Sequence, residues 1–389
     1  MTPIKVSDDS HYIFLIWEKA RNYENFLIEK ISENFIINEI YEISWTPKKF
    51  PNNLRRFYGP GKVGDVNKKT ELCGTGSFLL IIISDPNPIF DKRRTSKGME
   101  LVNINLFDKK KEFRTITKKG YAIHSSITPK ETNDDVTLLL GINLNDLNKK
   151  LPKNWDRKIK SIKCDLIGEN GWKNLEEMFY VLNSTINYLV FRNFEELGNT
   201  LSDYNHNDID ILTDDFLRIP YITNGGKSSF NNIFPKYVKI SDKKIILDFS
   251  YPQDGYYDIK WYKKILENRE LYNNFYIPSK EDYFFSLFYH AIFHQKKFAI
   301  DYKNKLLLLS KELDYLPLTK NIFDNIDNAE KFLEAFMKKN KFSHPNSLTY
   351  KIIHNRINQL IDTSLLIWKT QGFNFLIYVT KEKIKRIVK

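Results

Sequence analysis

The feature that most constrains the fold is the alternation of short apolar runs with segments of helical spacing. An apolar run over 12–17 is followed by apolar residues at 23, 26, 27 and 31, which lie on one face of a helix. Residues 35–45 return to strand-like alternation, and Phe78–Ser84 is a second apolar run that ends at an Asp-Pro-Asn-Pro turn. Strands that alternate with helices in this way are typical of an α/β sandwich.

A further strand and helix complete the first part of the chain. Residues 121–124 are strand-like, and Thr128-Pro129 has the pattern of a helix start, because threonine caps free backbone N–H groups and proline tolerates the first turn. The helical pattern continues to Leu140 and stops at Gly141. We therefore predict an α/β (α+β) domain over residues 1–145.

The remaining chain divides into three parts. Residues 146–158 are rich in Asn and Lys and contain Pro152, which predicts a linker. Strand-like runs within 159–274 predict a core with a mixed sheet, and a helical portion is predicted over 275–389. The expected helices of that last portion cover 281–295, 329–339 and 349–363.

Composition excludes several classes of protein. The 389 residues are 42% hydrophobic and 14% aromatic, which excludes a disordered chain. The uncharged apolar runs are far shorter than the ~20 residues of a membrane span, and the N-terminus lacks the apolar centre of a signal peptide. Two cysteines, Cys73 and Cys164, cannot form a disulfide framework or a four-ligand zinc site. We therefore expect a reducing compartment, the cytoplasm.

The net charge of +12 arises from 60 Lys and Arg against 48 Asp and Glu. Such a charge suits an anionic partner: a nucleotide, a phosphorylated glycan, a nucleic acid or a membrane surface. An AT-rich genome explains the Lys-rich composition equally well. Because the positive charges are scattered rather than gathered in a stripe, nucleic acid is not the favoured partner.

Carboxylates stand out in the predicted central core. In a strand, residues two apart face the same side, so Asp208 and Asp210 project together while Ile209 and Ile211 point to the other face. Asp248 lies in a later strand. Three clustered carboxylates repel one another unless a cation joins them, and oxygen ligands of this kind select Mg²⁺ or Mn²⁺. The alternative is a solvent-exposed strand edge.

This region resembles the nucleotidyltransferase-fold superfamily. The pattern of strand 188–191, a turn, a spacer of 194–207, the acidic strand from Asp208 and a later Asp248 carries the resemblance, which covers about residues 170–300. It implies a mixed sheet in which the three acids bind Mg²⁺ or Mn²⁺. It also implies transfer of a nucleoside monophosphate, or of a phosphoalditol or sugar phosphate, from a nucleotide donor to a hydroxyl acceptor.

One departure from the superfamily concerns the turn after the first strand. Where members carry Gly-Ser or Gly-Gly, this chain has Arg192-Asn193. An arginine there would clamp a donor phosphate by two parallel hydrogen bonds. The alternatives are a nucleotide held in another way and a loss of activity. The chain resembles the divergent members of bacterial polysaccharide loci, akin to choline-phosphate and fukutin-type transferases, which implies polysaccharide biosynthesis.

The N-terminal part resembles nucleoside diphosphate kinase, a ferredoxin-like sandwich. The resemblance rests on the strand–helix–strand opening, on Phe57-Tyr58-Gly59 and on 120–126, where a histidine ends a strand before a helix. It implies that His124 is a phosphoryl-carrying nucleophile. The chain departs from the family at 17–20 and at Ser125, so a domain that binds nucleotide without turnover remains an alternative.

The same resemblance implies roles for four further residues. Lys19, Tyr58 and Arg114 would lie near phosphates, and Asp135 would orient the imidazole of His124. A neutral imidazole attacks phosphorus once its other nitrogen is hydrogen-bonded to a carboxylate.

Two histidines lie four apart in the predicted helix over 281–295. His290 and His294 share one helical face and form a possible metal pair, but no Glu follows His290 as in zinc proteases. A packed helix face is therefore the preferred interpretation.

The sequence thus predicts an enzyme, a metal-dependent transferase centred on Asp208, Asp210 and Asp248. The first alternative is a phosphotransferase that uses His124. The second is a non-catalytic binder of an anionic polymer, in which the acids are a relict.

Overall fold

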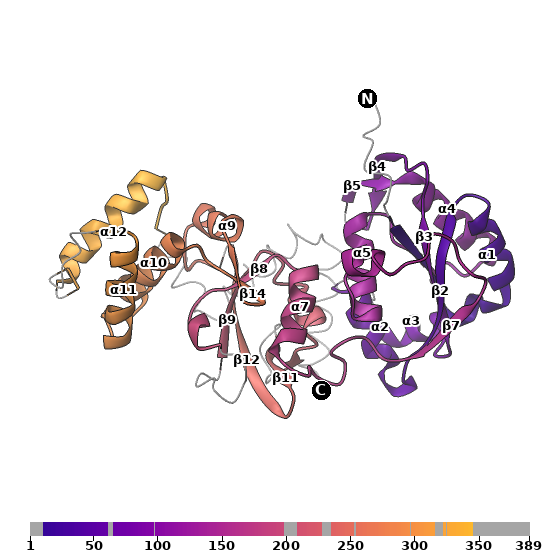
Figure 1. Ribbon diagram of the computed structural model, residues 1–389, viewed down its shortest axis with the longest axis horizontal. Helices are drawn as coiled ribbons and strands as arrows, with labels where there is room; N and C mark the ends of the chain where they lie inside the picture. Colours follow the sequence, from indigo (N-terminus) through magenta and orange to yellow (C-terminus); the bar gives the residue numbers. More distant parts are fainter. Residues whose placement is uncertain are drawn as a thin grey trace. The chain divides into compact units, whose positions relative to one another are not determined.

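The computed structural model describes residues 11–60, 65–96, 98–197, 208–227, 235–252, 254–295, 297–315, 322–323 and 325–344. These residues belong to two compact units (Figure 1). Unit 1 contains 11–173 and the short segment 220–224, and unit 2 contains 174–219 and the described residues from 225 onward. Both mix helices with open sheets, so the α/β class predicted from the sequence is confirmed.

The sheet of unit 1 has five strands in the order β6-β1-β3-β2-β7. β1 is antiparallel to β3 and β6, and β2 is antiparallel to β3 but parallel to β7. β3 lies in the middle, and Phe78–Ile83 are all buried, which explains why this strand reads as a continuous apolar run. The strands are β1 (His11–Ile16), β2 (Ile36–Ser44), β3 (Phe78–Ser84), β6 (Ile123–Ser125) and β7 (Ile159–Lys163).

Helices pack on this sheet: α1 against β2, α4 against β6 and α5 against β1. The N-cap of α5 forms as predicted, because the Thr128 hydroxyl accepts a hydrogen bond from Glu131 N. The helices are η1 (Glu18–Tyr23), α1 (Glu24–Ser32), η2 (Pro47–Lys49), α2 (Phe50–Tyr58), α3 (Val66–Cys73), α4 (Ile104–Thr117), α5 (Pro129–Leu140) and α6 (Leu144–Asn148). A hairpin of β4 (Phe90–Thr95) and β5 (Gly98–Asn103) precedes α4.

The predicted boundaries shift in the structure. β7 (Ile159–Lys163) pairs with β2, so residues 159–173 belong to unit 1 and not to the central core expected over 159–274. The linker expected over 146–158 includes the end of α6. The sequence did not reveal that β7 belongs to unit 1, because a parallel neighbour such as β2 can lie far away in the sequence.

The main sheet of unit 2 has the order β10-β11-β12-β9-β8. β9 and β12 are parallel, and the other neighbours are antiparallel. Its strands are β8 (Tyr188–Val190), β9 (Asp208–Thr213), β10 (Gly226–Lys227), β11 (Pro235–Ile240) and β12 (Lys243–Ser250). A hairpin of β13 (Glu270–Tyr272) and β14 (Phe275–Ile277) packs its second strand against β8.

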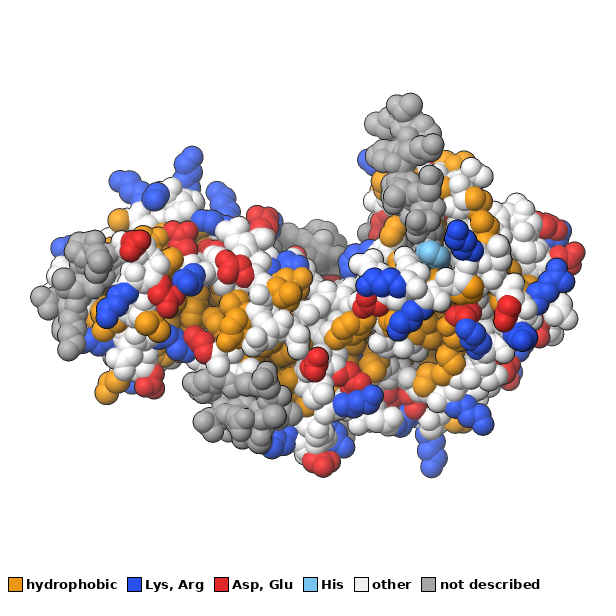
Figure 2. All heavy atoms as spheres, in the orientation of Figure 1, with side chains coloured by type: hydrophobic (Ala, Val, Ile, Leu, Met, Phe, Trp, Pro, Cys, Tyr) orange, Lys and Arg blue, Asp and Glu red, His pale blue; other side chains and the backbone are white. Residues whose placement is uncertain are grey.

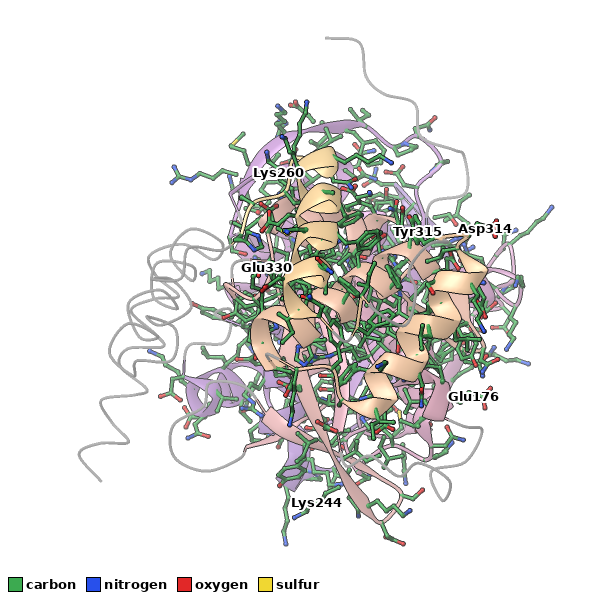
Figure 3. The ribbon with its side chains drawn as sticks, turned by 90° about the vertical axis from the view of Figure 1, so that its left-hand side faces the viewer. Glu176, Lys244, Lys260, Asp314, Tyr315 and Glu330 are labelled. Carbon is green, nitrogen blue, oxygen red and sulfur yellow. The ribbon has the colours of Figure 1, made fainter. Side chains whose placement is uncertain are left out.

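Helices prevail in the rest of unit 2, as predicted for 281–295 and 329–339. Figure 3 looks onto this region, with Glu330 on α12 and Asp314 and Tyr315 just after α11. Phe285 stacks on Phe336, which joins α10 to α12. The helices are α7 (Leu175–Thr185), η3 (Phe194–Glu196), α9 (Ile259–Glu267), α10 (Lys280–Tyr289), η4 (His290–Gln295), α11 (Ile300–Glu312) and α12 (Ile326–Asn340). The short helix α8 (Ile219–Ile222) begins at the last residue of a unit 2 segment and continues in the segment 220–224 of unit 1. The helix expected over 349–363 lies outside the described residues.

Two surface properties bear on function. Among the described helices, none has the length and apolarity that a membrane span requires. On the face shown in Figure 2, basic and acidic side chains are interspersed over the described surface, as the scattered charges of the sequence predict.

A buried arginine holds the segment 220–224 within unit 1. The Arg56 side chain is 1% exposed and its guanidinium pairs with Glu169, with Nη1 3.1 Å from Oε2. The other nitrogens donate to the carbonyls of Ile167, Tyr221 and Ile222 at 2.6–3.1 Å. Burial lowers the pKa of Arg56 to about 10, and the nearby Glu169 opposes this shift.

We predict that Arg56→Met destabilises unit 1 strongly. The change leaves the Glu169 carboxylate buried without its counter-charge, which costs about 3–5 kcal/mol. Denaturant unfolding followed by tryptophan fluorescence measures the loss. Lys68→Met on the exposed side of α3 is the control and should stay within about 0.5 kcal/mol of the wild type. Equal stability of the two variants would contradict this account of Arg56.

Candidate functional sites

The first candidate site lies on β6, the edge strand of the unit 1 sheet. The carbonyls of Ile123 and Ser125 face away from β1, because the neighbouring bonds to β1 come from the residues on either side. Arg114 Nε and Nη2 donate to Ile123 O at 3.0 and 2.9 Å, and Lys110 Nζ donates to Ser125 O at 2.9 Å. These two cations of α4 therefore fix the strand segment that carries His124.

The role expected for Arg114 differs from the contacts described. The resemblance implies a phosphate contact, whereas two nitrogens of the guanidinium bind a backbone carbonyl. Burial lowers the pKa of Arg114, which is consistent with a side chain drawn onto the edge of the sheet. Arg114 thus holds the backbone next to His124 in place.

His124 and Asp135 lie together, as the resemblance implies. The strand β6 and the helix α5 meet such that His124 Nε2 is 2.9 Å from Asp135 Oδ2, and both residues are buried. An ionised carboxylate only accepts hydrogen bonds, so Nε2 carries the hydrogen in this contact. The ring lone pair of a neutral His124 then lies on Nδ1.

Tyr58 lies beside His124, with ring centroids 5.7 Å apart. It ends α2, and its hydroxyl accepts a hydrogen bond of 3.0 Å from Trp17 Nε1. Lys69 Nζ lies 3.3 Å from the centroid of the Tyr58 ring, a cation–π contact. Burial raises the pKa of Tyr58 well above its usual range, so the phenol stays neutral.

Sequence reasoning missed Lys69 and Lys110. Lys69 is 9% exposed and lies on the buried side of α3 with Cys73, a position where an apolar residue is expected. A lysine in an apolar helix position is the one local signal that could have identified it. The predicted Lys19 is exposed on η1, and no contact described for its side chain joins it to His124.

The second candidate site lies on the unit 2 sheet, where three predicted acids share a face. The parallel register pairs Asp210 with Asp248 and Asp208 with Ile246. The alternate residue Ile209 is fully buried on the opposite face. The strand alternation and the common face of the acids are therefore as predicted.

Arg192 follows β8 and reaches this face. Its Nη2 donates to Asp210 Oδ1 at 2.8 Å, and Nη1 lies 2.9 Å from His290 Nδ1. The Nε–H is buried and has no hydrogen-bond partner among the described residues. Asn193 follows in the left-handed conformation with φ 54°, which asparagine tolerates and which turns the chain into η3.

Electrostatics ties Arg192 and Asp210 together. Burial raises the pKa of Asp210, Arg192 opposes this rise, and Asp248 and Asp208 add to it. Burial alone would lower the pKa of Arg192, but the charge and hydrogen bond of Asp210, together with Tyr257 and Tyr302, outweigh it and the pKa is raised. The pair is therefore an ion pair in which each partner keeps the other charged.

His290 and His294 lie on a π-helical turn, η4, rather than on a regular helix. Burial, aided by the charge of Arg192, lowers the pKa of His290 to about 3 and that of His294 to about 4. The sequence assigned both histidines to a packed helix face. It did not predict the contact of His290 with Arg192, which lies 98 positions earlier in the chain. Single π-turns within helices occur frequently at functional sites.

The described side chains do not form a preformed metal site. Arg192 binds Asp210, and in the described part of the chain no group of three or more His, Cys, Asp or Glu side chains could hold a metal ion. The Mg²⁺ or Mn²⁺ site at Asp208, Asp210 and Asp248 therefore stays a prediction. The side chains as arranged here do not fit such a metal ion.

Comparisons with protein-family models, with curated proteins and with solved structures give no match. The function is therefore argued from the geometry of the two sites.

We predict that acid destabilises unit 2 through His290, which is buried, and His294, which is half-buried. The unfolded chain takes up protons near pH 6.5, whereas folded His290 and His294 do so only near pH 3 and 4, so stability falls as the pH drops below about 6.5. Between pH 7 and pH 5 each histidine should cost about 2 kcal/mol. Denaturant unfolding at several pH values measures this loss.

The double variant His290→Gln/His294→Gln isolates this effect. Burial raises the pKa of Asp254 to about 6, which acts in the opposite direction, but this group is common to both proteins. The variant should lose less stability than the wild type on acidification. Identical pH profiles for the two proteins would show that the pair does not titrate in this way.

Proposed function

We propose that unit 1 is a phosphotransferase in which His124 carries the phosphoryl group. The observation that supports this most directly is the hydrogen bond of 2.9 Å between His124 Nε2 and Asp135 Oδ2. The four strands β6-β1-β3-β2 are antiparallel in an order that agrees with a ferredoxin-like sandwich, the fold that the resemblance to nucleoside diphosphate kinase implies. This was the first alternative from the sequence, and the geometry favours it over the metal-dependent transferase.

The proposed reaction has two steps. The Nδ1 lone pair of His124 attacks the terminal phosphorus of a nucleoside triphosphate; the N–P bond forms, and the P–O bond to the diphosphate breaks with its electron pair on that oxygen. Asp135 stabilises the ring, which becomes positively charged. A phosphate oxygen of an acceptor then attacks the same phosphorus, and the N–P bond breaks with its electrons returning to His124.

The surroundings of His124 suit an anionic substrate. The ammonium of Lys69 adds positive charge beside Tyr58, whose neutral phenol can donate a hydrogen bond without repelling a phosphate. Arg114 and Lys110 hold the backbone on both sides of His124, which keeps the imidazole in place for attack. A nucleotide donor also agrees with the cytoplasmic location expected from the sequence.

We predict that His124→Asn abolishes transfer of the terminal phosphate of radiolabelled ATP to the protein. Asp135→Asn should slow labelling by about 10²- to 10⁴-fold, because the orienting acid fixes the tautomer of the imidazole. Incubation followed by acid and alkali treatment of the protein measures the label, since phosphohistidine is lost in acid and survives alkali.

Asp134→Asn is the matched control, because Asp134 neighbours Asp135 on α5 and pairs with Lys130 instead. It should label at the rate of the wild type. A label that persists in His124→Asn, or equal rates for the Asp134 and Asp135 variants, would contradict the proposal.

A second candidate function concerns unit 2: transfer of a group from a nucleotide-linked donor. The observation that favours it is the parallel pairing of β9 and β12, which sets Asp210 beside Asp248 in the order that the resemblance to nucleotidyltransferases implies. The buried Nε–H of Arg192 is a donor available for a phosphate oxygen. The acceptor would be a glycan or another hydroxyl compound.

We predict that one donor class raises the thermal midpoint of the wild type but not of Asp208→Asn. The ligands are nucleoside triphosphates, nucleoside diphosphate sugars and CDP-alditols, each with Mn²⁺ and with EDTA. A ligand at one hundred times its Kd stabilises by about 2.7 kcal/mol, which is readily measured. Equal shifts in both proteins would place the nucleotide elsewhere, and the absence of any shift would count against this function.

A further inference from the structure

The guanidinium of Arg192 contacts two side chains of types that commonly bind metal ions. Asp210 Oδ1 is 2.8 Å from Nη2, and His290 Nδ1 is 2.9 Å from Nη1. Carboxylate oxygens and neutral imidazole nitrogens are both common metal ligands. A guanidinium only donates hydrogen bonds, so both groups present an acceptor to it, as they would to a metal ion.

This contact is costly to break. The side chains of Arg192 and Asp210 are 14% and 15% exposed, so neither charge is well solvated on its own. Removing one member of such a pair leaves an uncompensated charge in a low dielectric. A divalent ion approaching Asp210 would also meet the positive charge of Arg192 at close range.

The two remaining acids do not replace Asp210. Asp208 and Asp248 are exposed, and Asp208 lies opposite Ile246, two residues from Asp248 in the register. That displacement is about 6.6 Å along the strand, so the two carboxylates flank Asp210. This agrees with the lack of any three-ligand metal group among the described side chains.

We infer that the Arg192 guanidinium is the resident cation of this face and excludes a divalent ion from Asp210 in the ligand-free protein. Arg192 neutralises the charge of Asp210 and holds the His290 ring in place, as a metal ion bound to both side chains would do. The inference depends on neither proposed activity, because it concerns the protein and the metal alone.

Mn²⁺ is the probe, and its binding is measured near neutral pH from the electron paramagnetic resonance signal of the free ion. If the wild-type protein binds any Mn²⁺, Asp210→Asn should leave that binding unchanged. Arg192→Ala should bind Mn²⁺ at least about tenfold more tightly than the wild type does, because a like charge is removed and Asp210 is released. The double variant Arg192→Ala/Asp210→Asn should lose this gain.

The matched control is Arg218→Ala, since Arg218 pairs with Asp215 in the same unit. It should bind Mn²⁺ like the wild type. If Arg192→Ala does not fold, Arg192→Gln carries the same expectation, because the amide keeps a donor for Asp210 without the charge. Wild-type binding that depends on Asp210 would overturn the inference whatever the variants do, and so would equal Mn²⁺ affinity in the wild type and in a folded Arg192 variant.

Discussion

Buried positive charge is the constraint on which both units depend. A guanidinium removed from water is tolerated only where carboxylates and carbonyls meet its donors. In unit 1, Arg56 satisfies this condition with Glu169 and three carbonyls, and in doing so it keeps the segment 220–224 in that unit. In unit 2, Arg192 contacts Asp210 and His290, and its buried Nε–H has no hydrogen-bond partner among the described residues. The donors of the second arginine are therefore matched less fully than those of the first.

The two candidate sites use the same kind of contact for different ends. Asp135 binds a ring nitrogen of His124 and so directs the lone pair of that ring to the other nitrogen, as the proposed nucleophile requires. Asp210 binds a cation that cannot lose its proton, so the same carboxylate chemistry neutralises a charge and prepares no base. This difference is why the geometry supports phosphoryl transfer more directly in unit 1 than metal-dependent transfer in unit 2.

Much of the local structure could be predicted from the sequence. The period of two residues placed Asp208 and Asp210 on one face, and the capping pattern at Thr128 marked the start of α5. The approach of Asp135 to His124 was implied by the family resemblance, and Asp135 lies in α5, the helix that directly follows the strand of His124. The contact between Arg192 and His290 could not be predicted, because 98 positions separate the two and helix packing brings them together.

The sequence by itself determined several of the elements, such as the strands β1, β3 and β9 and the helices α1, α5 and α10, because apolar spacing and capping depend on neighbours a few residues away. Only the tertiary structure decided that β7 pairs with β2 and that Arg114 donates hydrogen bonds to a backbone carbonyl of β6. It also decided that the guanidinium of Arg192 pairs with Asp210, a carboxylate expected to bind a metal ion. The physical reason is that strand order, register and helix packing bring distant residues together. A buried charge then pairs with whichever group of opposite charge the fold places beside it.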